Sequence, residues 1–528
     1  MSENKDKPTT PPAEAPASST DVYAIHGADP EVLAYAMAKY SRSALTMKES
    51  LVEISAQRAE QFLNTFYFAY GHRSIADLAH LPFAIERLSL LAAIALVDEQ
   101  RWDGQERSTR YQDFRRSGWY TPPELGAEAE HYTAAAEALF LSYERISGEM
   151  SDALKGVVAR PESMKLEVYE RTLRARAFDV ARYLLPLATN TSLGQIVNAR
   201  TLETQISRLL TSEFAEIRSL GEKLKEAAAA PVWNVRNADD QVLCQEIGSV
   251  DERCADLART HLLREVKAAP TLVKYAAPNE YQAATRAELR QAAAELLSKE
   301  AILEAPVVDL IDDGEPLEVE LAASLLYPYC HYPYRQVRDH VAALNESKRT
   351  EIIRLGARHR GRHDELLRSF SAGQALRFDI LMDIGGFRDM HRHRRCVQLL
   401  QGYTDLHGYD LPECPGQPTL AEAGIEAEYT AAMESAFASY RALKASGIAE
   451  AGQSAQYLLP LGTRCRSLFK MDFAEAVYIS ELRTGSGGHF SYRRVAYAMY
   501  EAVAQRHPSL AEYFRVEDVR EPLDLLRR

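Results

Sequence analysis

An internal repeat constrains the fold of this chain most, because two copies of one sequence unit fold as two related structural units. The segment Glu-Ala-Glu-His-Tyr-Thr-Ala-Ala begins at Glu128, and Glu-Ala-Glu-Tyr-Thr-Ala-Ala begins at Glu426. Both segments run on to the pattern Phe-x-Ser-Tyr, and the pentapeptide Tyr-Leu-Leu-Pro-Leu follows at residues 183–187 and again at 457–461. Ordered matches of this kind predict two tandem copies of a unit of roughly 250 residues.

We place the two units at residues 21–280 and 281–528, with the boundary somewhere within residues 266–301. Residues 1–20 are rich in Pro, Ser, Thr and Ala and have little to bury, so they are predicted to be a disordered tail. The 528-residue chain as a whole is 46% apolar and 26% charged, which is enough to build a large core.

Helix is expected to be the main secondary structure, because apolar residues recur at helical spacing and Ala, Leu, Glu and Arg dominate. One buried helix is expected from Pro82 to Val97, with Ser74 upstream as a candidate N-cap. Short extended runs are expected at residues 22–25 and 307–311, one at the start of each unit. The predicted fold class is therefore α+β, with one helix-rich unit used twice.

The composition argues against several functional classes. The net charge of −13 and the pI near 5.7 disfavour a nucleic-acid or anionic membrane partner. The six cysteines lie at wide spacings without a Cys-x-x-Cys pair, which indicates a reducing, cytoplasmic compartment. The most apolar stretch, residues 88–97, is far shorter than the roughly 20 residues that cross a bilayer, and the N-terminus lacks the apolar run of a secretory signal.

Two polar clusters are candidates for ligand binding. Residues 388–395 read Arg-Asp-Met-His-Arg-His-Arg-Arg, and arginine forks match the oxygens of a phosphate. A solvated basic face is the alternative interpretation, and a metal site at His391 and His393 is disfavoured because no carboxylate or Cys set accompanies them. Residues 106–111 combine a carboxylate, a hydroxyl and guanidinium groups, which suit a phosphate and a polar base, or form a surface turn.

These clusters carry a resemblance to a known family. The motifs that carry it are Gly71-His72, Glu106-x-Ser108-x-Arg110-Tyr111, Arg182-Tyr-Leu-Leu-Pro-Leu-Ala-Thr189 and Asn198-Ala-Arg200 in the first unit, and Arg392-His393-Arg394 with Arg483 in the second. In these motifs the chain resembles flavin-dependent thymidylate synthase, as two fused copies of a family that normally has one. The resemblance implies a helix-rich α+β unit with a small mixed sheet.

The resemblance also implies a reaction, its cofactors and an assembly. The family methylates dUMP to dTMP with FAD as cofactor, and with methylenetetrahydrofolate and NADPH as co-substrates. Its tetramers build each active site from several subunits, so two fused chains would form a homodimer that acts as a four-unit pseudo-tetramer. No protein nucleophile is required, because the flavin carries the difficult chemistry.

Residue roles follow from the same resemblance. The implied substrate-binding residues are Glu106, Ser108, Arg110, Arg182 and Arg483. The implied cofactor-binding residues are Arg392, His393, Arg394, Asn198 and Arg200. The implied catalytic residues are Ser108, Arg483 and His72. His72 matches a position near the folate-binding region, although Arg73 follows it where the family has a carboxylate.

The two copies depart from the family in complementary ways. The first unit has Asp98-Glu99-Gln100 in place of Arg-His-Arg, which inverts the local charge. The second unit keeps Arg-His-Arg but has Val397 and Gly402 where serines are expected, and Gln456 in place of the Arg182 equivalent. We therefore hypothesise that each copy lost the half of the site that the other copy provides, which leaves composite pockets between units.

Two other interpretations remain open from sequence. A binding protein or inactive paralogue, with a regulatory or assembly role, would also lose motifs in this way, and flavin-dependent methylation of a uracil in RNA is a third possibility that the acidic charge disfavours. The Tyr-rich segment at residues 327–334 is not explained by the resemblance. Its prolines favour aromatic side chains packed at a turn over a base-stacking platform.

Overall fold

The computed structural model describes residues 23, 25, 27–39, 46–53, 56–63, 73–297, 299–362 and 364–527. The tail expected at residues 1–20, His72, and most of the extended run expected at 22–25 lie outside the described residues. In the part of the chain that is described, no helix combines the length and apolarity needed to span a membrane.

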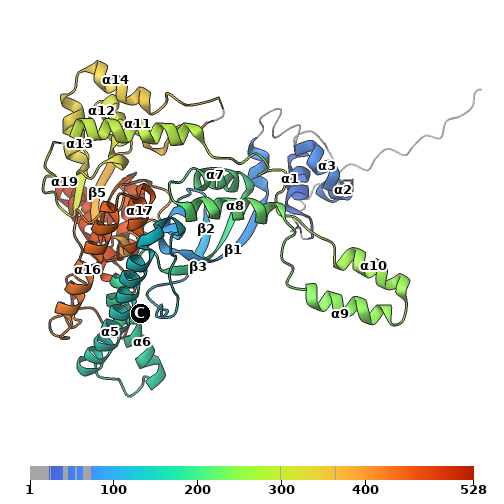
Figure 1. Ribbon diagram of the computed structural model, residues 1–528, viewed down its shortest axis with the longest axis horizontal. Helices are drawn as coiled ribbons and strands as arrows, with labels where there is room; N and C mark the ends of the chain where they lie inside the picture. The colour runs from blue at the N-terminus through green and yellow to red at the C-terminus, as the bar shows by residue number, and fades with distance from the viewer. Residues whose placement is uncertain are drawn as a thin grey trace, which may run out of the picture.

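A three-stranded antiparallel sheet lies at the centre of the first unit, in the order β1–β3–β2 (Figure 1). Its strands are β1 (His80–Ser89), β2 (Asp103–Glu106) and β3 (Asn190–Asn198). The helices before residue 300 are α1 (Pro30–Lys39), α2 (Met47–Glu53), α3 (Ala56–Leu63), α4 (Leu90–Leu96), α5 (Ala129–Val157), α6 (Leu166–Ala181), α7 (Ala199–Leu210), α8 (Ala215–Ala229), α9 (Asn237–Gly248), α10 (Glu252–Leu262) and α11 (Glu280–Leu297).

The helix expected from Pro82 to Val97 is wrong for its first half, which belongs to β1. A β-bulge between Glu86 and Leu88, with Arg87 at a φ of 60°, shifts the alternation of β1. Buried residues therefore fall at positions 81, 85 and 88, a spacing that imitates a helix.

The N-cap of α4 is Ser89, whose Oγ accepts a hydrogen bond from the Ala92 amide at 2.9 Å. The expected cap, Ser74, lies instead in the 3₁₀ helix η2 (Arg73–Leu78), upstream of β1. The strand β1 thus separates Ser74 from the helix that it was expected to cap.

The second unit repeats this arrangement and adds one strand. Its antiparallel sheet has the order β4–β5–β7–β6, from β4 (Val308–Ile311), β5 (Leu376–Asp383), β6 (Val397–Leu400) and β7 (Arg464–Met471). The extended run expected at 307–311 is thus confirmed as β4. Its other helices are α12 (Leu317–Leu326), α13 (Tyr334–Ala343), α14 (Glu346–Leu355), α15 (Ile384–Met390), α16 (Glu426–Ala445), α17 (Ala449–Ser454), α18 (Phe473–Thr484) and α19 (Phe490–Arg506).

Side-chain caps set the same strand-to-helix turns in both units. Asn198 caps α7 by accepting from the Thr201 amide, and its counterpart Asp472 caps α18 in the same way. Asp383 caps α15, as Ser89 caps α4 in the first unit. Polar residues with short side chains at these positions start each helix directly after a strand. They therefore set the position of the loop that follows each helix.

The repeated pentapeptides pair with each other across the two units. The Leu187 amide donates to the Leu459 carbonyl at 3.0 Å, the Leu461 amide donates to the Leu185 carbonyl at 2.9 Å, and Pro186 lies opposite Pro460. The repeated helices α5 and α16 also pack side by side, and one apolar core cluster draws on both units (Figure 1). Because each segment contacts its own counterpart, an approximate two-fold axis relates the units.

Each of two smaller core clusters lies on one side of the predicted boundary between the units. Residues up to Ala276 pack with the first sheet, whereas residues from Leu289 in α11 pack with α12. The boundary at residues 280 and 281 stays a proposal.

The Tyr-rich segment is buried at a turn, as expected: Tyr327 and Tyr334 contact each other edge to face at 5.9 Å, and Asp379 accepts from both.

Candidate functional site

The two-fold packing brings arginines of both units to one place within a single chain. Arg110 lies in the loop after β2, and Arg182 begins the 3₁₀ helix η4 (Arg182–Leu184). From the second unit, Arg392 follows the C-terminus of α15, and Arg483 lies in the last turn of α18. The sequence predicted that these residues share a site, and the structure brings them together without a second chain.

Tyr492, from α19, contacts two of these arginines. The guanidinium carbon of Arg483 is 5.3 Å from the centre of the Tyr492 ring, and that of Arg110 is 5.9 Å from it. Arg110 Nη1 also donates to the Tyr492 hydroxyl at 3.1 Å. One aromatic ring thus contacts two cations that the chain contributes from opposite units.

Asp389, in α15, is the anion around which the arginines gather. Arg182 Nη1 donates to its carboxylate at 3.2 Å. Burial by itself would raise the pKa of Asp389, but the charges of Arg182, Arg392, Arg110 and Arg483 hold that pKa at about 2. Four guanidinium groups therefore act on the charge of Asp389, and one of them, that of Arg182, contacts its carboxylate directly.

A second carboxylate orients Arg110. Arg110 Nε donates to Asp179 Oδ1 at 2.8 Å, and Arg110 Nη2 donates to Asp179 Oδ2 at 3.3 Å and to the Gly487 carbonyl at 3.2 Å. His489 contacts the backbone of the same residue, with Nε2 at 2.9 Å from the Asp179 carbonyl oxygen. This network fixes the direction of the Arg110 fork before any ligand binds.

Sequence reasoning missed four of these residues, namely Asp179, Asp389, His489 and Tyr492. One signal was available, because the run Gly485-Ser-Gly-Gly488 directly follows the helix that carries Arg483. A glycine-rich turn next to a proposed phosphate-binding arginine indicates close backbone approach to a site.

Glu106 and Ser108 lie in the same first-unit loop but have different surroundings. Glu106 is buried and accepts from Arg388 Nη2 of the second unit at 2.6 Å. Ser108 is half-buried, and its Oγ accepts from the Arg110 amide at 3.2 Å. The cluster at residues 388–395 is thus largely internal and not the solvated basic face of the alternative interpretation, since Arg388, His391 and His393 are all buried.

His393 connects the Arg392–Arg394 motif to Arg483. Arg483 Nε donates to His393 Nε2 at 2.7 Å, so that nitrogen is an acceptor. Burial, reinforced by the charges of Arg483 and Arg394, lowers the pKa of His393 to about 3. A neutral imidazole therefore holds the Arg483 side chain in place.

Arg394 and Asn198 line one cavity of about 360 Å³ between the units. The Arg394 guanidinium lies 4.5 Å from the centre of the Trp102 ring, and its Nε and Nη2 atoms are buried without a hydrogen-bond partner among the described residues. Arg200, two residues beyond Asn198, instead pairs with Asp77 at 3.5 Å and Glu365 at 3.3 Å. The cavity therefore unites two of the predicted cofactor residues, whereas Arg200 points to carboxylates.

The chemistry that this arrangement suits is the binding of an anion. Arg182 carries two further buried nitrogens without a partner, and Arg388 carries one, in the described part of the chain. Unpaired buried donors of this kind are costly unless a ligand accepts from them. The described residues contain no group of three or more His, Cys, Asp or Glu side chains with the geometry of a metal site.

Comparison with known proteins matches the two-unit arrangement. A family model described as thymidylate synthase complementing protein matches the chain twice, over residues 24–232 and 311–509. A UPF0159 protein of Chlamydia muridarum is 27% identical over 530 residues, covering 93% of this chain and 91% of the relative. A UPF0159 protein of Thermoplasma acidophilum is 25% identical over 518 residues, covering 91% of this chain and 94% of the relative.

Proteins named for an activity match a smaller part of the chain. A flavin-dependent thymidylate synthase of Clostridium tetani is 26% identical over 200 residues, covering 37% of this chain and 76% of the relative. The crystal structure of the flavin-dependent thymidylate synthase of Helicobacter pylori, complexed with FAD and dUMP, has a TM-score of 0.26 and 17% identity, covering 38% of this chain and 89% of that one. The family matches together span well over half of the sequence and confirm the predicted resemblance. The chain belongs to the family of the thymidylate synthase complementing protein, whose unit it carries twice in tandem.

Proposed function

We propose that the chain methylates dUMP to dTMP, with FAD as cofactor and with methylenetetrahydrofolate and NADPH as co-substrates. The observation that carries the proposal is the convergence of Arg110, Arg182 and Arg483 from two units around one buried place. Each unit alone lacks part of this set, because the second unit has Gln456 where the first has Arg182. The fused chain thus supplies one composite site.

The dUMP phosphate would bind to the arginines that surround Asp389. Guanidinium forks match phosphate oxygens. Two nitrogens of Arg182 have no acceptor among the described residues and could donate to the phosphate. Glu106 and Ser108 would orient the nucleotide, and Arg483 would stabilise negative charge on the uracil carbonyl as the ring is activated. In this scheme Tyr492 keeps Arg110 and Arg483 apart, so that both can reach one ligand.

The residues around Arg394 fit an anionic cofactor such as FAD. The buried, unpartnered nitrogens of Arg394 would neutralise its phosphates together with Arg392, while His393 would lie against it as a neutral side chain. Asn198 would approach from the first unit, and Arg200 would exchange its carboxylate partners for the cofactor. Bound FAD would supply the redox chemistry of the methyl transfer.

A measurement of dUMP-dependent tritium release tests the proposal. We expect Arg483→Ala and Ser108→Ala to lower kcat/KM by about 100-fold or more, because each removes a contact to the reacting nucleotide. Arg358→Ala is the matched control, since Arg358 pairs with Glu288 on the exposed surface and lies outside the site. Turnover that survives both site substitutions would contradict a composite site.

A flavin- or nucleotide-binding paralogue without turnover is the alternative function. The observation that favours it is that protein partners already occupy Glu106, Arg110 and Arg182, through Arg388, Asp179 and Asp389. Purified protein that is yellow but releases no tritium from dUMP, with folate and NADPH present, would favour this alternative.

The proposed function also implies an assembly, a residue that binds folate and a cellular compartment. We infer that two chains form a homodimer of four units, in a cytoplasmic compartment and without a membrane or nucleic-acid partner. His72 would contribute to folate binding as the third catalytic residue. Sedimentation equilibrium checks the assembly, and the effect of His72→Ala on the KM for methylenetetrahydrofolate checks that role.

A further inference from the structure

A second, larger cavity of about 1700 Å³ lies where the internal two-fold relates it to the proposed site. Its wall contains Asp98, Thr404 and Gln456, which correspond in the repeat to Arg392, Arg110 and Arg182 of the proposed site. Because these counterparts lack the arginine forks, the cavity cannot hold a phosphate in the same way. The cavity is nevertheless large enough for a ligand, and other residues of its wall determine which ligand would fit.

The acidic motif that replaces Arg-His-Arg is neutralised within the wall. Asp98 pairs with Arg368 at 2.5 Å, and Glu99 pairs with Arg208 at 2.9 Å. Burial opposes ionisation of Asp98, yet Arg368 and its neighbours keep its pKa below the usual range. These four side chains therefore present no net charge to a ligand.

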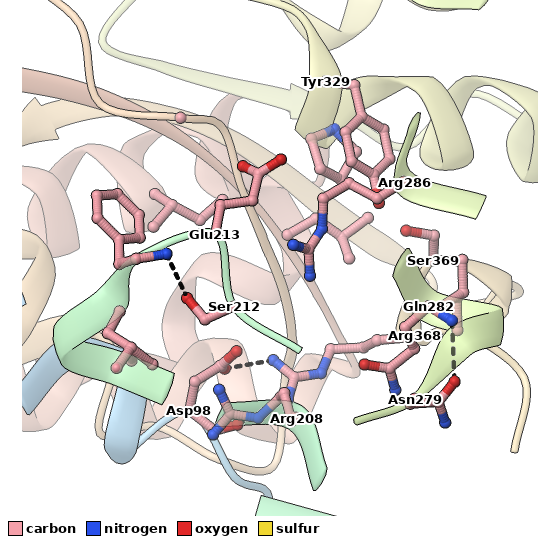
Figure 2. Close-up of a pocket in the computed structure, with 18 of the residues that line it drawn as sticks. Asp98, Arg208, Ser212, Glu213, Asn279, Gln282, Arg286, Tyr329, Arg368 and Ser369 are labelled. Carbon is pink, nitrogen blue, oxygen red and sulfur yellow. Dashed lines mark hydrogen bonds and ion pairs between the residues drawn. The ribbon is translucent and has the colours of Figure 1, made fainter. Parts of the chain in front are cut away.

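Arg286 is an arginine of the cavity wall that makes no ion pair within 4.0 Å among the described residues, although its charge, after the larger effect of Arg290, helps to lower the pKa of Glu213 in the same wall. Arg286 projects from α11 into the cavity, facing Arg208 and Arg368 (Figure 2). Its Nη1 donates to the Thr211 carbonyl at 3.2 Å, and among the described residues no carboxylate lies within 4.0 Å of it. Tyr329, from the Tyr-rich segment, lies beside it in the same wall (Figure 2). An anionic group and an adjacent flat ring would both find partners here.

The part of the wall that the second unit contributes holds polar atoms without partners. Gln401 Oε1 and the Tyr403 hydroxyl have no hydrogen bond among the described residues, and His391 Nε2 has none either, although it lies 3.6 Å from Asp98 Oδ1; all three side chains line the cavity. They are deeply buried, with exposed fractions of 1%, 9% and 9%. Buried donors and acceptors left unpaired are rare in proteins, and a ligand with polar edges would satisfy them. The His391 ring also stacks on Phe387 at 5.1 Å, which makes this end aromatic.

We propose that this cavity is a second ligand site, which binds a planar heteroaromatic molecule that carries an anionic group. The ring, with its own donors and acceptors, lies against Tyr403, Gln401 and His391, and the anionic group pairs with Arg286. The cavity exceeds the roughly 300–1000 Å³ of ordinary small-molecule sites, so it admits a molecule of nucleotide size. A nucleoside monophosphate and a pteroylglutamate share this chemistry.

Equilibrium dialysis with labelled dTMP and labelled folic acid tests the proposal on the full chain, without a measurement of turnover. We expect at least one probe to bind at a site that Arg286→Ala weakens by at least 10-fold and that Arg483→Ala leaves unchanged. Arg358→Ala, a surface arginine outside the cavity, is the control and keeps wild-type binding. The probe that responds to Arg286→Ala identifies the source of the ligand.

Tyr403→Phe keeps the test decisive if Arg286→Ala does not fold. Because the Tyr403 hydroxyl has no partner in the protein, its removal should leave the melting temperature unchanged or higher, while weakening the probe about 5- to 10-fold. Binding of both probes that neither substitution alters would overturn the proposal, as would the absence of binding by both probes. Loss of turnover at the first site would not affect either outcome.

Discussion

Asp389 illustrates how single residues set the electrostatics of this site. It is one carboxylate among four arginines, and its pKa of about 2 lies below the usual value of 3.8. A depressed carboxylate pKa contributes stability above the unfolded-state pKa, and that stability is lost as the pH falls from about 4 to 2. Asp389 thus stabilises the free protein by occupying the place where we expect a phosphate.

We expect Asp389→Asn to lower the free energy of unfolding by about 2 kcal/mol at pH 7, because Arg182 loses its ion-pair partner and three nearby arginines lose a neighbouring negative charge. Urea titrations at pH 7 and at pH 3 measure the effect, and the difference between variant and wild type should shrink at the lower pH. Asp339→Asn, at an exposed aspartate that pairs with Arg338, is the control with little effect. An equal loss for both variants would contradict this account.

Inorganic phosphate should reverse part of that loss. In the Asp389→Asn variant the Asp389 carboxylate no longer competes for the arginines, although Asp179 still pairs with Arg110, so added phosphate should raise the melting temperature more than it does in wild type. Differential scanning fluorimetry across a phosphate series measures this, with potassium chloride at matched ionic strength as the control. A smaller shift in the variant than in wild type would be inconsistent with an anion site at Asp389.

Residue types could be predicted from sequence here, but residue neighbours could not. The arginines at 110, 182, 392 and 483 follow from motifs, whereas Asp389 lies in a run that sequence reasoning treated only as basic. Tyr492 comes from another helix, and nothing local marks its ring as a contact of two arginines. Such contacts depend on how α15, α18 and α19 pack, which no single-sequence pattern encodes.

Among the elements, the short strand β2 positions Trp102 and through it Arg394. Gly104 lies in β2, and a Cβ there would come within 2.4 Å of the Gly194 carbonyl oxygen and 2.5 Å of the Trp102 ring. We expect Gly104→Ala to displace the Trp102 ring, destabilise the protein by about 1–3 kcal/mol and weaken flavin binding. Chemical denaturation and a flavin fluorescence titration measure the two effects.

Gly148→Ala is the matched control for that substitution. Gly148 lies within α5, and a Cβ there meets nothing within 4 Å, so the change should stabilise the helix by about 0.5–1 kcal/mol and leave flavin binding unchanged. If Gly104→Ala behaved like Gly148→Ala, the close approach of β2 to Trp102 would not matter.

The elements also show where sequence patterns fail. The long helices α5 and α16 follow from their repeated apolar spacing, and both contain the segments from which the repeat was recognised. In contrast, β1 reads as helix because its bulge shifts the buried positions. The strand β2 has the sequence Asp-Gly-Gln-Glu, with no apolar alternation, and exists because it pairs with β3.

At the scale of the whole molecule, the shared core couples the unfolding of the two units. Leu458 is fully buried in that core, within the 3₁₀ helix η7 (Ala455–Leu458) of the second unit. All three tryptophans of the chain lie in the first unit, so their fluorescence reports on that unit alone. We expect Leu458→Ala to reduce the stability seen by tryptophan fluorescence by about 2–5 kcal/mol.

Comparison of tryptophan fluorescence with far-UV circular dichroism completes that measurement. Coincident denaturation curves for both probes, shifted together by Leu458→Ala, indicate one cooperative molecule. An unchanged fluorescence midpoint beside a shifted dichroism curve would mean that the units unfold separately.

The sequence predicted two units from the repeat, but it could not show that the repeated pentapeptides touch, because recurrence along a chain carries no information about distance in space.

The pairing of Pro186 with Pro460 has a consequence for inheritance. In an assembly of identical chains, every substitution is present at both symmetric surfaces at once, so an acidic replacement of Arg392 would harm two pockets together. Joined in one polypeptide, the halves are encoded by separate codons, and each codon alters only one surface. Natural selection can therefore preserve one pocket while it reshapes the other.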